Sequence, residues 1–166
     1  RNVSRRPASE LRFHLYWNAR RNADSTYMRE AALRGSPRRV RDDEWGSIDV
    51  TSLRLRNPAV SQDLTSQLKY IAPDDENAAD RTVFAVPLPQ AVKPQETIDV
   101  EIEWTARVPR PFNRTGYVGD YYFFGQWFPK IGVLEDAGWN VHQFHNVTEF
   151  YADFGVYDVR MTVPRG

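Results

Sequence analysis

The sequence predicts a mainly β fold, either an antiparallel β-sandwich or a saddle-shaped sheet, with one short peripheral helix. Unbroken apolar–polar alternation over 97–108 places one face of a strand on a core and the other in water, as in antiparallel sheets. Turn-forming Pro, Gly, Asn and Asp recur between short alternating segments, which is typical of sandwiches. The length of 166 residues suits one domain, so we expect a single β domain over 1–166, with residues 1–9 flexible.

The amino-terminal part predicts one strand and the helix. In 11–18, Leu, Phe, Leu and Trp alternate with polar residues, which predicts a half-buried strand with His14 on its polar face. Either Asp24 or Ser25 can cap a short helix over 25–34, and the Gly-Ser-Pro that follows ends it. We expect this helix to lie at the edge of the architecture.

Further strands are predicted along the rest of the chain. In 45–57 the apolar residues change parity, and a β-bulge near 51–52 reconciles the two halves. Segments 67–72 and 82–88 are joined by turn formers, which predicts a hairpin. Alternation at 157–163 predicts a closing strand. About seven or eight strands are expected in total.

Composition excludes several classes of function. Lys and Arg number 22 and Asp and Glu number 22, so no net field favours nucleic acid, and we expect no nucleic-acid partner. The absence of Cys excludes disulfides, thiolate metal sites and thiol nucleophiles. No apolar run approaches the roughly 20 residues that span a bilayer, so we expect no membrane segment in this chain.

The sequence offers few groups for catalysis or metal binding. His142, His145 and Glu149 form H-x-x-H-x-x-x-E, which has enough donors for a metal but needs a helix to converge. Flanking aromatic residues instead predict strand and turn, and Glu135 with Asp136 predicts a turn. The motifs H-E-x-x-H and G-x-S-x-G are absent. We therefore assign no catalytic, cofactor-binding or metal residue.

Aromatic residues provide an alternative function. Tyr121, Tyr122, Trp127 and Trp139 could form a stacking platform for sugars, or they could pack in the core and at a domain interface. The first possibility would make the chain a free-standing β-sandwich module that binds carbohydrate or protein. Both interpretations remain open from the sequence.

Three stretches together resemble a known family. They are LRFHLYWNA at 11–19, FFGQWFPKIGVLEDAGW at 123–139 and TEFYADFGVYDVRMTVP at 148–164. They are similar to the amino-terminal β domain of zinc aminopeptidases related to alanyl aminopeptidase and leukotriene hydrolase, particularly the bacterial aminopeptidase-like branch. The resemblance covers roughly 10–164, and D-F-G-x-Y-D-V is its most specific part.

The resemblance implies a non-catalytic domain of a zinc metallopeptidase. In that family the β domain packs against a following thermolysin-like catalytic domain of the same polypeptide and walls the substrate cleft. Zinc, H-E-x-x-H and the G-x-M-E-N motif belong to the catalytic domain, so we expect no cofactor and no enzyme activity in this chain. Peptide substrate is expected only for the full-length protein, and an extracytoplasmic or membrane-associated parent is favoured.

Two departures from the family pattern limit what is carried over. The family places a Gln or Glu near the substrate amine, upstream of F-P-C, whereas Phe128-Pro129 precedes Lys130 here. Gln126 lies too close to this step, so that role is not assigned to it. The family domain also has strands before the equivalent of Leu11. An unpaired sheet edge and weak self-association are therefore expected.

Overall fold

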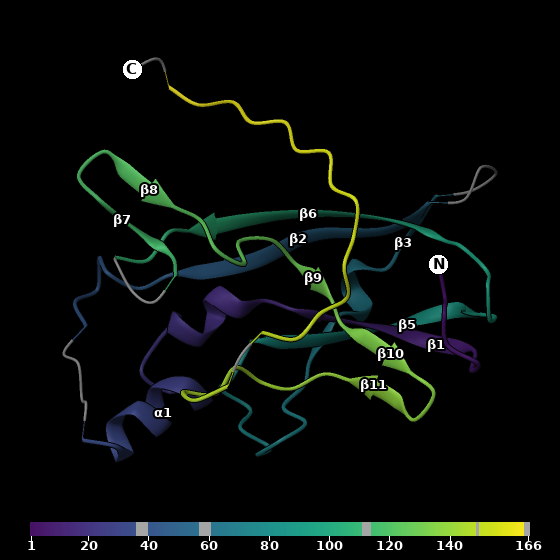
Figure 1. Ribbon diagram of the computed structural model, residues 1–166, viewed down its shortest axis with the longest axis horizontal. Helices are drawn as coiled ribbons and strands as arrows, with labels where there is room; N and C mark the ends of the chain where they lie inside the picture. Colours follow the sequence, from purple (N-terminus) through teal and green to yellow (C-terminus); the bar gives the residue numbers. More distant parts are fainter. Residues whose placement is uncertain (36–39, 57–60, 111–113, 149, 165–166) are drawn as a thin grey trace.

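The structure is a computed structural model that describes residues 1–35, 40–56, 61–110, 114–148 and 150–164. These residues form a mainly β fold with antiparallel sheets and one short α-helix, as the sequence predicts (Figure 1). In chain order the elements are β1 (Ala8–His14), the 3-10 helix η1 (Tyr16–Arg20), α1 (Thr26–Leu33), β2 (Ser47–Arg56), β3 (Ser61–Asp63), η2 (Thr65–Gln67), β4 (Lys69–Tyr70), β5 (Val83–Val92), β6 (Asp99–Arg107), β7 (Gly116–Val118), β8 (Tyr121–Phe123), β9 (Lys130–Ile131), β10 (Val133–Glu135) and β11 (Gly138–Asn140).

Two sheets form the body of the molecule. One has the strand order β4-β5-β1-β9 and the other has the order β3-β2-β6, and all their pairs are antiparallel. Strand β1 is central, because it pairs with β5 from Ala8–Val92 to His14–Val83 and with β9 at Phe13 and His14. Two short hairpins, β7-β8 and β10-β11, form separate two-stranded sheets.

The hydrophobic core lies between the two sheets. Its buried members come from β1, η1, β2, β5 and the loop before η2: Leu11, Phe13, Leu15, Trp17, Ile48, Leu53, Leu64, Phe84 and Val86. The rings of Phe13 and Phe84 stack with centroids 5.0 Å apart. From β6, Val100, Ile102 and Trp104 pack against this core but stay only half-buried. The apolar face predicted for 97–108 is therefore the face that points to the core.

Three local predictions are confirmed. The register of β2 on β6 shifts between Val50 and Ser52, which makes Thr51 the extra residue of a β-bulge. Ser25 caps α1, since its hydroxyl accepts a hydrogen bond from the Met28 N–H at 3.3 Å. The predicted hairpin also forms, because β4 pairs antiparallel with β5.

A buried asparagine joins η1 to the sheets. The Asn18 amide nitrogen donates to the carbonyls of Ile48, at 3.0 Å, and Arg81, at 2.8 Å. Its carbonyl accepts the Ile48 N–H at 2.9 Å. Because Asn18 is 1% exposed, these bonds replace water completely. They fix η1, and with it the residues before α1, against β2.

The segment 1–9, for which we expect flexibility, makes specific contacts in the structure. Asn2 is buried, and its side chain donates to the carbonyls of Arg6 at 2.7 Å and Val92 at 2.9 Å. Its backbone N–H donates to Glu96 at 2.9 Å. Strand β1 also takes in the last two residues of this segment.

The sequence places His14 on the polar face of its strand, either at the surface or at an interface, and the structure buries it against other parts of the chain. His14 is 3% exposed, and its ring stacks on Tyr16 with centroids 4.7 Å apart. The reason is that β1 has neighbours on both edges, while residues of 140–151 cover the face that was expected to meet water. Alternation along one strand cannot show that a distant segment covers its polar face.

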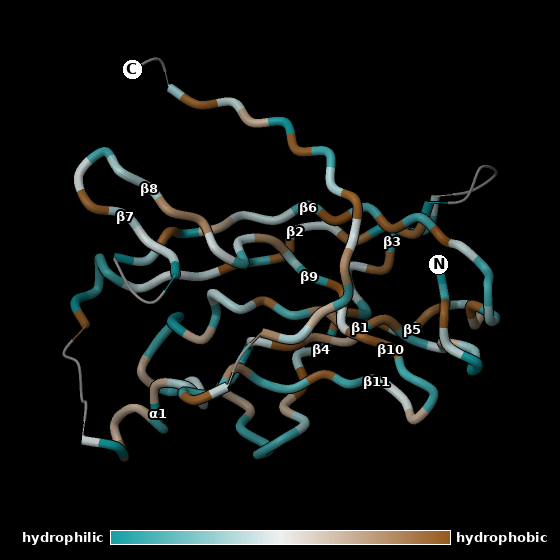
Figure 2. The backbone as a smooth tube through the Cα atoms, viewed as in Figure 1, coloured by the Kyte–Doolittle hydropathy of each residue, from teal (hydrophilic) through white to brown (hydrophobic). Residues whose placement is uncertain are grey.

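The predicted strand at 157–163 is also not formed. Residues 153–164 are exposed, and no strand occurs in the described residues after Asn140. The carboxyl-terminal segment, defined here as residues 152–164, leads away from the sheets (Figure 1), and hydrophobic and hydrophilic residues alternate along it (Figure 2). A strand needs a neighbour to pair its backbone groups, and the segment has none in the described chain.

Candidate functional site

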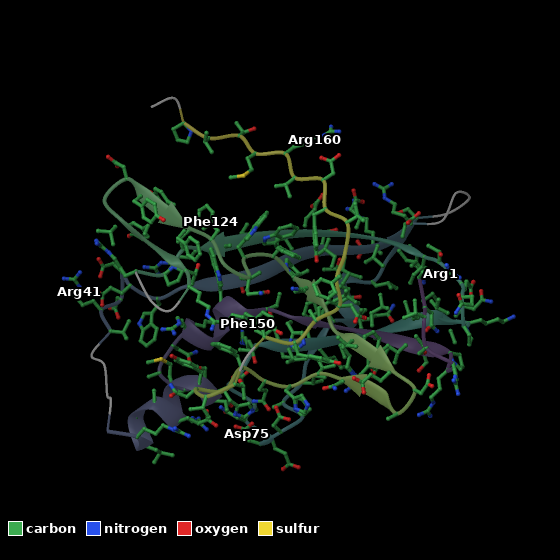
Figure 3. All side chains as sticks on the ribbon, viewed as in Figure 1. Arg1, Arg41, Asp75, Phe124, Phe150 and Arg160 are labelled. Carbon is green, nitrogen blue, oxygen red and sulfur yellow. The ribbon has the colours of Figure 1, made fainter. Side chains whose placement is uncertain are left out.

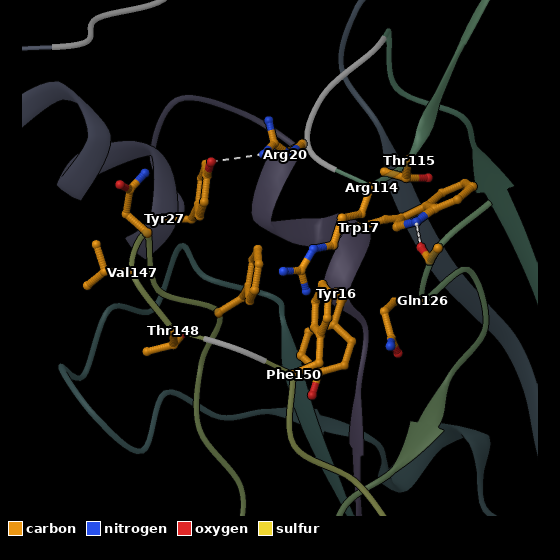
Figure 4. Close-up of a pocket in the computed structure, with 13 residues that line it drawn as sticks. Tyr16, Trp17, Arg20, Tyr27, Arg114, Thr115, Gln126, Val147, Thr148 and Phe150 are labelled. Atoms are coloured by element: carbon orange, nitrogen blue, oxygen red, sulfur yellow. Dashed lines mark hydrogen bonds between the residues drawn. The ribbon is translucent and has the colours of Figure 1, made fainter. Parts of the chain in front are cut away.

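A cavity of about 530 Å³ opens between η1, the first turn of α1, and the segments around residues 125 and 144–150 (Figure 4). This feature is called the aromatic pocket here. Its size suits a small organic ligand, and pockets of that kind are lined mainly by apolar and aromatic side chains with a few placed polar groups. The residues that line it come from five separate parts of the chain.

Aromatic rings form one wall of this pocket. Tyr16 meets Phe150 edge-on with centroids 4.6 Å apart, and it meets Phe144 at 5.7 Å. Phe144 stacks between Tyr27, at 5.4 Å, and Phe150, at 5.0 Å. Because each ring is held by another, the wall is fixed by packing between η1, α1 and the segment after β11.

Two guanidinium groups also line the pocket. Arg20 is 6% exposed, donates to the Tyr27 hydroxyl at 2.9 Å and lies over that ring at 4.6 Å. Arg114 lies over the Phe150 ring at 5.8 Å and is exposed to solvent. Both cations are thus associated with aromatic faces, a favourable arrangement for a planar guanidinium.

A strained turn at Gly125 and Gln126 forms the opposite side. The Trp17 indole N–H donates to the Gly125 carbonyl at 2.8 Å, and a Cβ at Gly125 would lie 2.3 Å from the Arg114 carbonyl oxygen. Only glycine fits there. Gln126 follows with a φ of 53°, a left-handed conformation that is unfavourable for a side chain with a Cβ.

The Gln126 side chain is unusual in a second respect. Its carbonyl oxygen is buried and has no hydrogen-bond partner in the described chain, although the residue lines the pocket. A buried, unpaired carbonyl is unfavourable by about 1–3 kcal/mol. Strain and an unpaired acceptor at one residue make Gln126 a candidate for contact with a ligand.

In the segment after β11, next to the residues that line the pocket, two histidines bind acidic residues. His142 Nδ1 lies 2.7 Å from Asp74 Oδ1, and His145 Nε2 lies 3.1 Å from Asp74 Oδ2. His145 Nδ1 lies 2.7 Å from Glu30 Oε1 of α1. This group, the His–acid cluster, ties the segment after β11 to α1 and to the turn that contains Asp74. The same segment supplies Phe144 to the pocket wall.

Ionisation in the His–acid cluster is altered by these contacts. Burial opposes the charged form of His145, but hydrogen bonds to Glu30 and Asp74 outweigh it and raise its pKa above 6.5. Burial likewise opposes ionised Asp74, yet hydrogen bonds from His142, His145 and a backbone N–H lower its pKa. The cluster therefore favours a cationic His145 between carboxylates.

His14 behaves in the opposite way. Burial, followed by the charges of His142 and Lys130, lowers its pKa from 6.5 to about 4. Neither ring nitrogen has a hydrogen-bond partner in the described residues. This histidine is therefore neutral at physiological pH and serves as a packed ring beside Tyr16.

The other candidate residues from the sequence, those of the possible metal site and of the Glu135–Asp136 turn, can also be placed. Within the described residues no group of three or more His, Asp or Glu side chains is arranged to hold a metal ion, and Glu149 of the H-x-x-H-x-x-x-E pattern lies outside those residues. The turn predicted at Glu135 and Asp136 joins β10 to β11. No helix in the described ranges is long and apolar enough to cross a membrane.

The four residues of the predicted stacking platform divide into two pairs. Tyr121 and Tyr122 are exposed on β8, whereas Trp127 and Trp139 are half-buried and pack against the main core. Among the described residues, no ring contact joins the two pairs, although Tyr122 stacks on Tyr117. The sequence also gave no signal for the aromatic pocket, since its rings come from segments that meet only in three dimensions.

A second hollow surface lies along β6. Two adjoining cavities of about 450 and 300 Å³ share Val100 and Ile131, and the larger is also lined by Ile102, Trp104 and Phe128. This β6 groove is open because β6 pairs only with β2 among the described strands. It exposes apolar side chains that a complete sandwich would cover.

The start of the carboxyl-terminal segment borders this groove. Tyr157 meets the Phe128 ring at 5.9 Å, and the fully exposed Phe154 and Val156 lie at the groove's rim. Beyond them the chain leaves the body, with Arg160 far out on it (Figure 3). Comparisons with family models, curated proteins and solved structures find no match for this chain, so its sites are interpreted from their own geometry.

Proposed function

We propose that the chain is a non-catalytic domain of a zinc aminopeptidase-like protein that packs against a thermolysin-like catalytic domain and walls its substrate cleft. The observation that carries this proposal is the carboxyl-terminal segment. It holds six exposed large apolar residues, Phe154, Val156, Tyr157, Val159, Met161 and Val163. Apolar residues gathered on one exposed segment beside an open groove indicate a docking surface.

The chemistry of the described residues agrees with a supporting role. Each histidine of the His–acid cluster is engaged with a carboxylate, and His14 is buried beside Tyr16. Zinc and the groups that activate water would belong to the catalytic domain. This chain would supply rigid packing, and the peptide substrate would be bound by the full-length protein.

Binding between separately purified domains tests the proposal. The chain is titrated with the thermolysin-like domain of the same gene, and the dissociation constant is measured by calorimetry. Phe154→Asp should weaken binding by at least tenfold, since it places a charge where an aromatic ring would be buried. Val118→Asp is the matched control, because Val118 is also exposed but lies on the β7 hairpin.

Two results would contradict the docking role. One is unchanged affinity of the Phe154→Asp variant. The other is stoichiometric zinc uptake, or hydrolysis of amino-acid amides, by the chain alone. The first result would show that Phe154 does not take part in docking. The second would show that this chain itself binds zinc or hydrolyses peptides.

A second candidate is a free-standing module that binds a small ligand in the aromatic pocket, and Gln126 favours it. Its buried, unpaired carbonyl needs a donor, and the hydroxyl groups of a sugar could provide one beside the aromatic wall. Titration with a panel of mono- and disaccharides, followed by protein NMR, tests this. Shifts confined to the pocket, and lost in Gln126→Ala, would favour the module; a pocket that no saccharide perturbs would remove it.

A further inference from the structure

Two features of this chain have no partner among the described residues. Strand β6 has one paired edge, on β2, and one edge that no described strand occupies. Its half-buried Val100, Ile102 and Trp104 leave the β6 groove open beside that edge. The carboxyl-terminal segment has exposed apolar residues and no backbone hydrogen bond to the rest of the described chain. An edge of this kind is a template for another strand.

The sequence patterns of these two features match. In 157–163 every second residue is apolar and exposed, which is the pattern of a strand with one buried face. Strand β6 has the same alternation. Pairing the two would place the apolar face of 157–163 over the groove. The outward Asp158 and Arg160, which pair with each other at 4.0 Å, would then lie on the same face as the outward residues of β6, so the match rests on the apolar face and not on charge.

The path of the chain indicates which molecule receives the segment. Tyr157 is held against Phe128 of its own groove, and the following residues point away from their own β6 (Figure 1). We infer that 157–163 of one copy adds as a strand to the free edge of β6 in a second copy, and that the exchange is mutual. A mutual exchange closes with two-fold symmetry and stops at a dimer.

The apolar surface available is sufficient for such a dimer. Three apolar side chains, Val159, Met161 and Val163, would be covered in each segment, while Tyr157 stays against its own Phe128. At about 100 Å² for each side chain, two segments and the grooves that receive them bury roughly 1,200 Å². That total lies at the lower end of the range for a stable interface. Backbone hydrogen bonds along β6 would add to it.

Sedimentation velocity on the chain at micromolar to millimolar concentration tests the exchange. We expect a monomer–dimer equilibrium. Val159→Lys should raise the dissociation constant roughly 100-fold, because each of two copies loses a buried apolar contact that accounts for about tenfold. Thr162→Lys is the matched control: it adds the same charge to the opposite face of the same segment and should leave dimerisation intact. Both positions are exposed, so neither variant disturbs the fold of the monomer.

Hydrogen exchange identifies the surfaces involved. Amides of β6 and of 157–163 should gain protection together as concentration rises, and this gain should vanish in Val159→Lys. Four results would overturn the inference: a monomer at every concentration, a dimer that Val159→Lys does not weaken, protection outside these two segments, or protection of 157–163 that is independent of concentration. The last result would show that the segment folds back on its own β6. The exchange uses residues 157–163, which also belong to the proposed docking surface. Its failure leaves all six exposed residues available and the docking proposal standing, whereas a confirmed exchange would leave Phe154 and Val156 for a catalytic domain.

Discussion

Replacing Gln126 with glycine should stabilise the protein. Gln126 combines a left-handed φ of 53° with a buried carbonyl that has no partner among the described residues. Glycine relieves a backbone strain of about 1 kcal/mol in the folded state. Its greater backbone freedom also stabilises the unfolded state by about 0.5–1 kcal/mol, so the two effects on the free energy of unfolding nearly cancel. Removing the unpaired carbonyl should contribute a further 1–3 kcal/mol, less some lost packing. We expect a net gain of about 1 kcal/mol in the free energy of unfolding.

A second glutamine in the same backbone conformation provides the control. Gln95 has a φ of 68°, but its side chain is exposed. Gln95→Gly changes the backbone terms equally and removes no buried carbonyl, so its effect should be close to zero. The difference between the two variants, measured by urea unfolding at one pH, isolates the buried carbonyl. If Gln126→Gly were equally or less stable than Gln95→Gly, the argument that Gln126 is strained for function would fail.

Three further predictions concern stability and pH. Asn18→Ala removes the partner of two buried backbone groups of Ile48 and of the partly buried Arg81 carbonyl, and it should lower the free energy of unfolding by about 3–4 kcal/mol in chemical denaturation. Asn22 is half-buried and its side chain accepts one hydrogen bond, from the exposed Asp24 N–H, so Asn22→Ala should lower it by about 1 kcal/mol. A loss for Asn18→Ala no larger than that for Asn22→Ala would refute the role of Asn18. His14 has a pKa lowered to about 4, so as pH falls the unfolded chain binds a proton at His14 before the folded chain does. The free energy of unfolding should therefore fall by about 3 kcal/mol from pH 6.5 to pH 4. His14→Phe should reduce this dependence on pH, and parallel pH profiles for the variant and the parent chain would contradict the prediction. His145 has a raised pKa, so its stabilising effect on the fold is fully present below pH 6.5 and is lost as pH rises through the folded-state pKa. Thermal melts of the parent chain should therefore show stability declining over that pH range, and the decline should be absent in His145→Gln. An unchanged decline in the variant would mean that another group causes it.

Local sequence patterns predicted those parts of the fold that depend on neighbours in the chain. The bulge at Thr51, the Ser25 cap and the core face of β6 each follow from a few consecutive residues. His14 could not be placed in this way, because a segment more than a hundred residues later covers it. The strand predicted at 157–163 has the correct alternation but has no neighbour in the described chain to complete its hydrogen bonds.

The candidate sites were even less accessible to prediction. The aromatic pocket is assembled from η1, α1 and the segments before β7, after β8 and after β11, and its defining property is the conformation of one residue, Gln126. A left-handed glutamine leaves no pattern in a sequence, since neither its neighbours nor its polarity is unusual. His142 and His145 were recognised as potential ligands, but their acidic partners, Asp74 and Glu30, come from distant loops and helices.

The central position of β1 has a consequence for synthesis on the ribosome. Phe13 is translated well before its two cross-strand partners, Phe84 and Ile131. Strand β1, which supplies Leu11 and Phe13 to the core, must therefore wait with both edges open until β5 and β9 have been translated. Such a nascent chain is exposed to misassembly with its neighbours on a polysome, and it should depend on holdase chaperones more than a protein whose first strand closes a local hairpin.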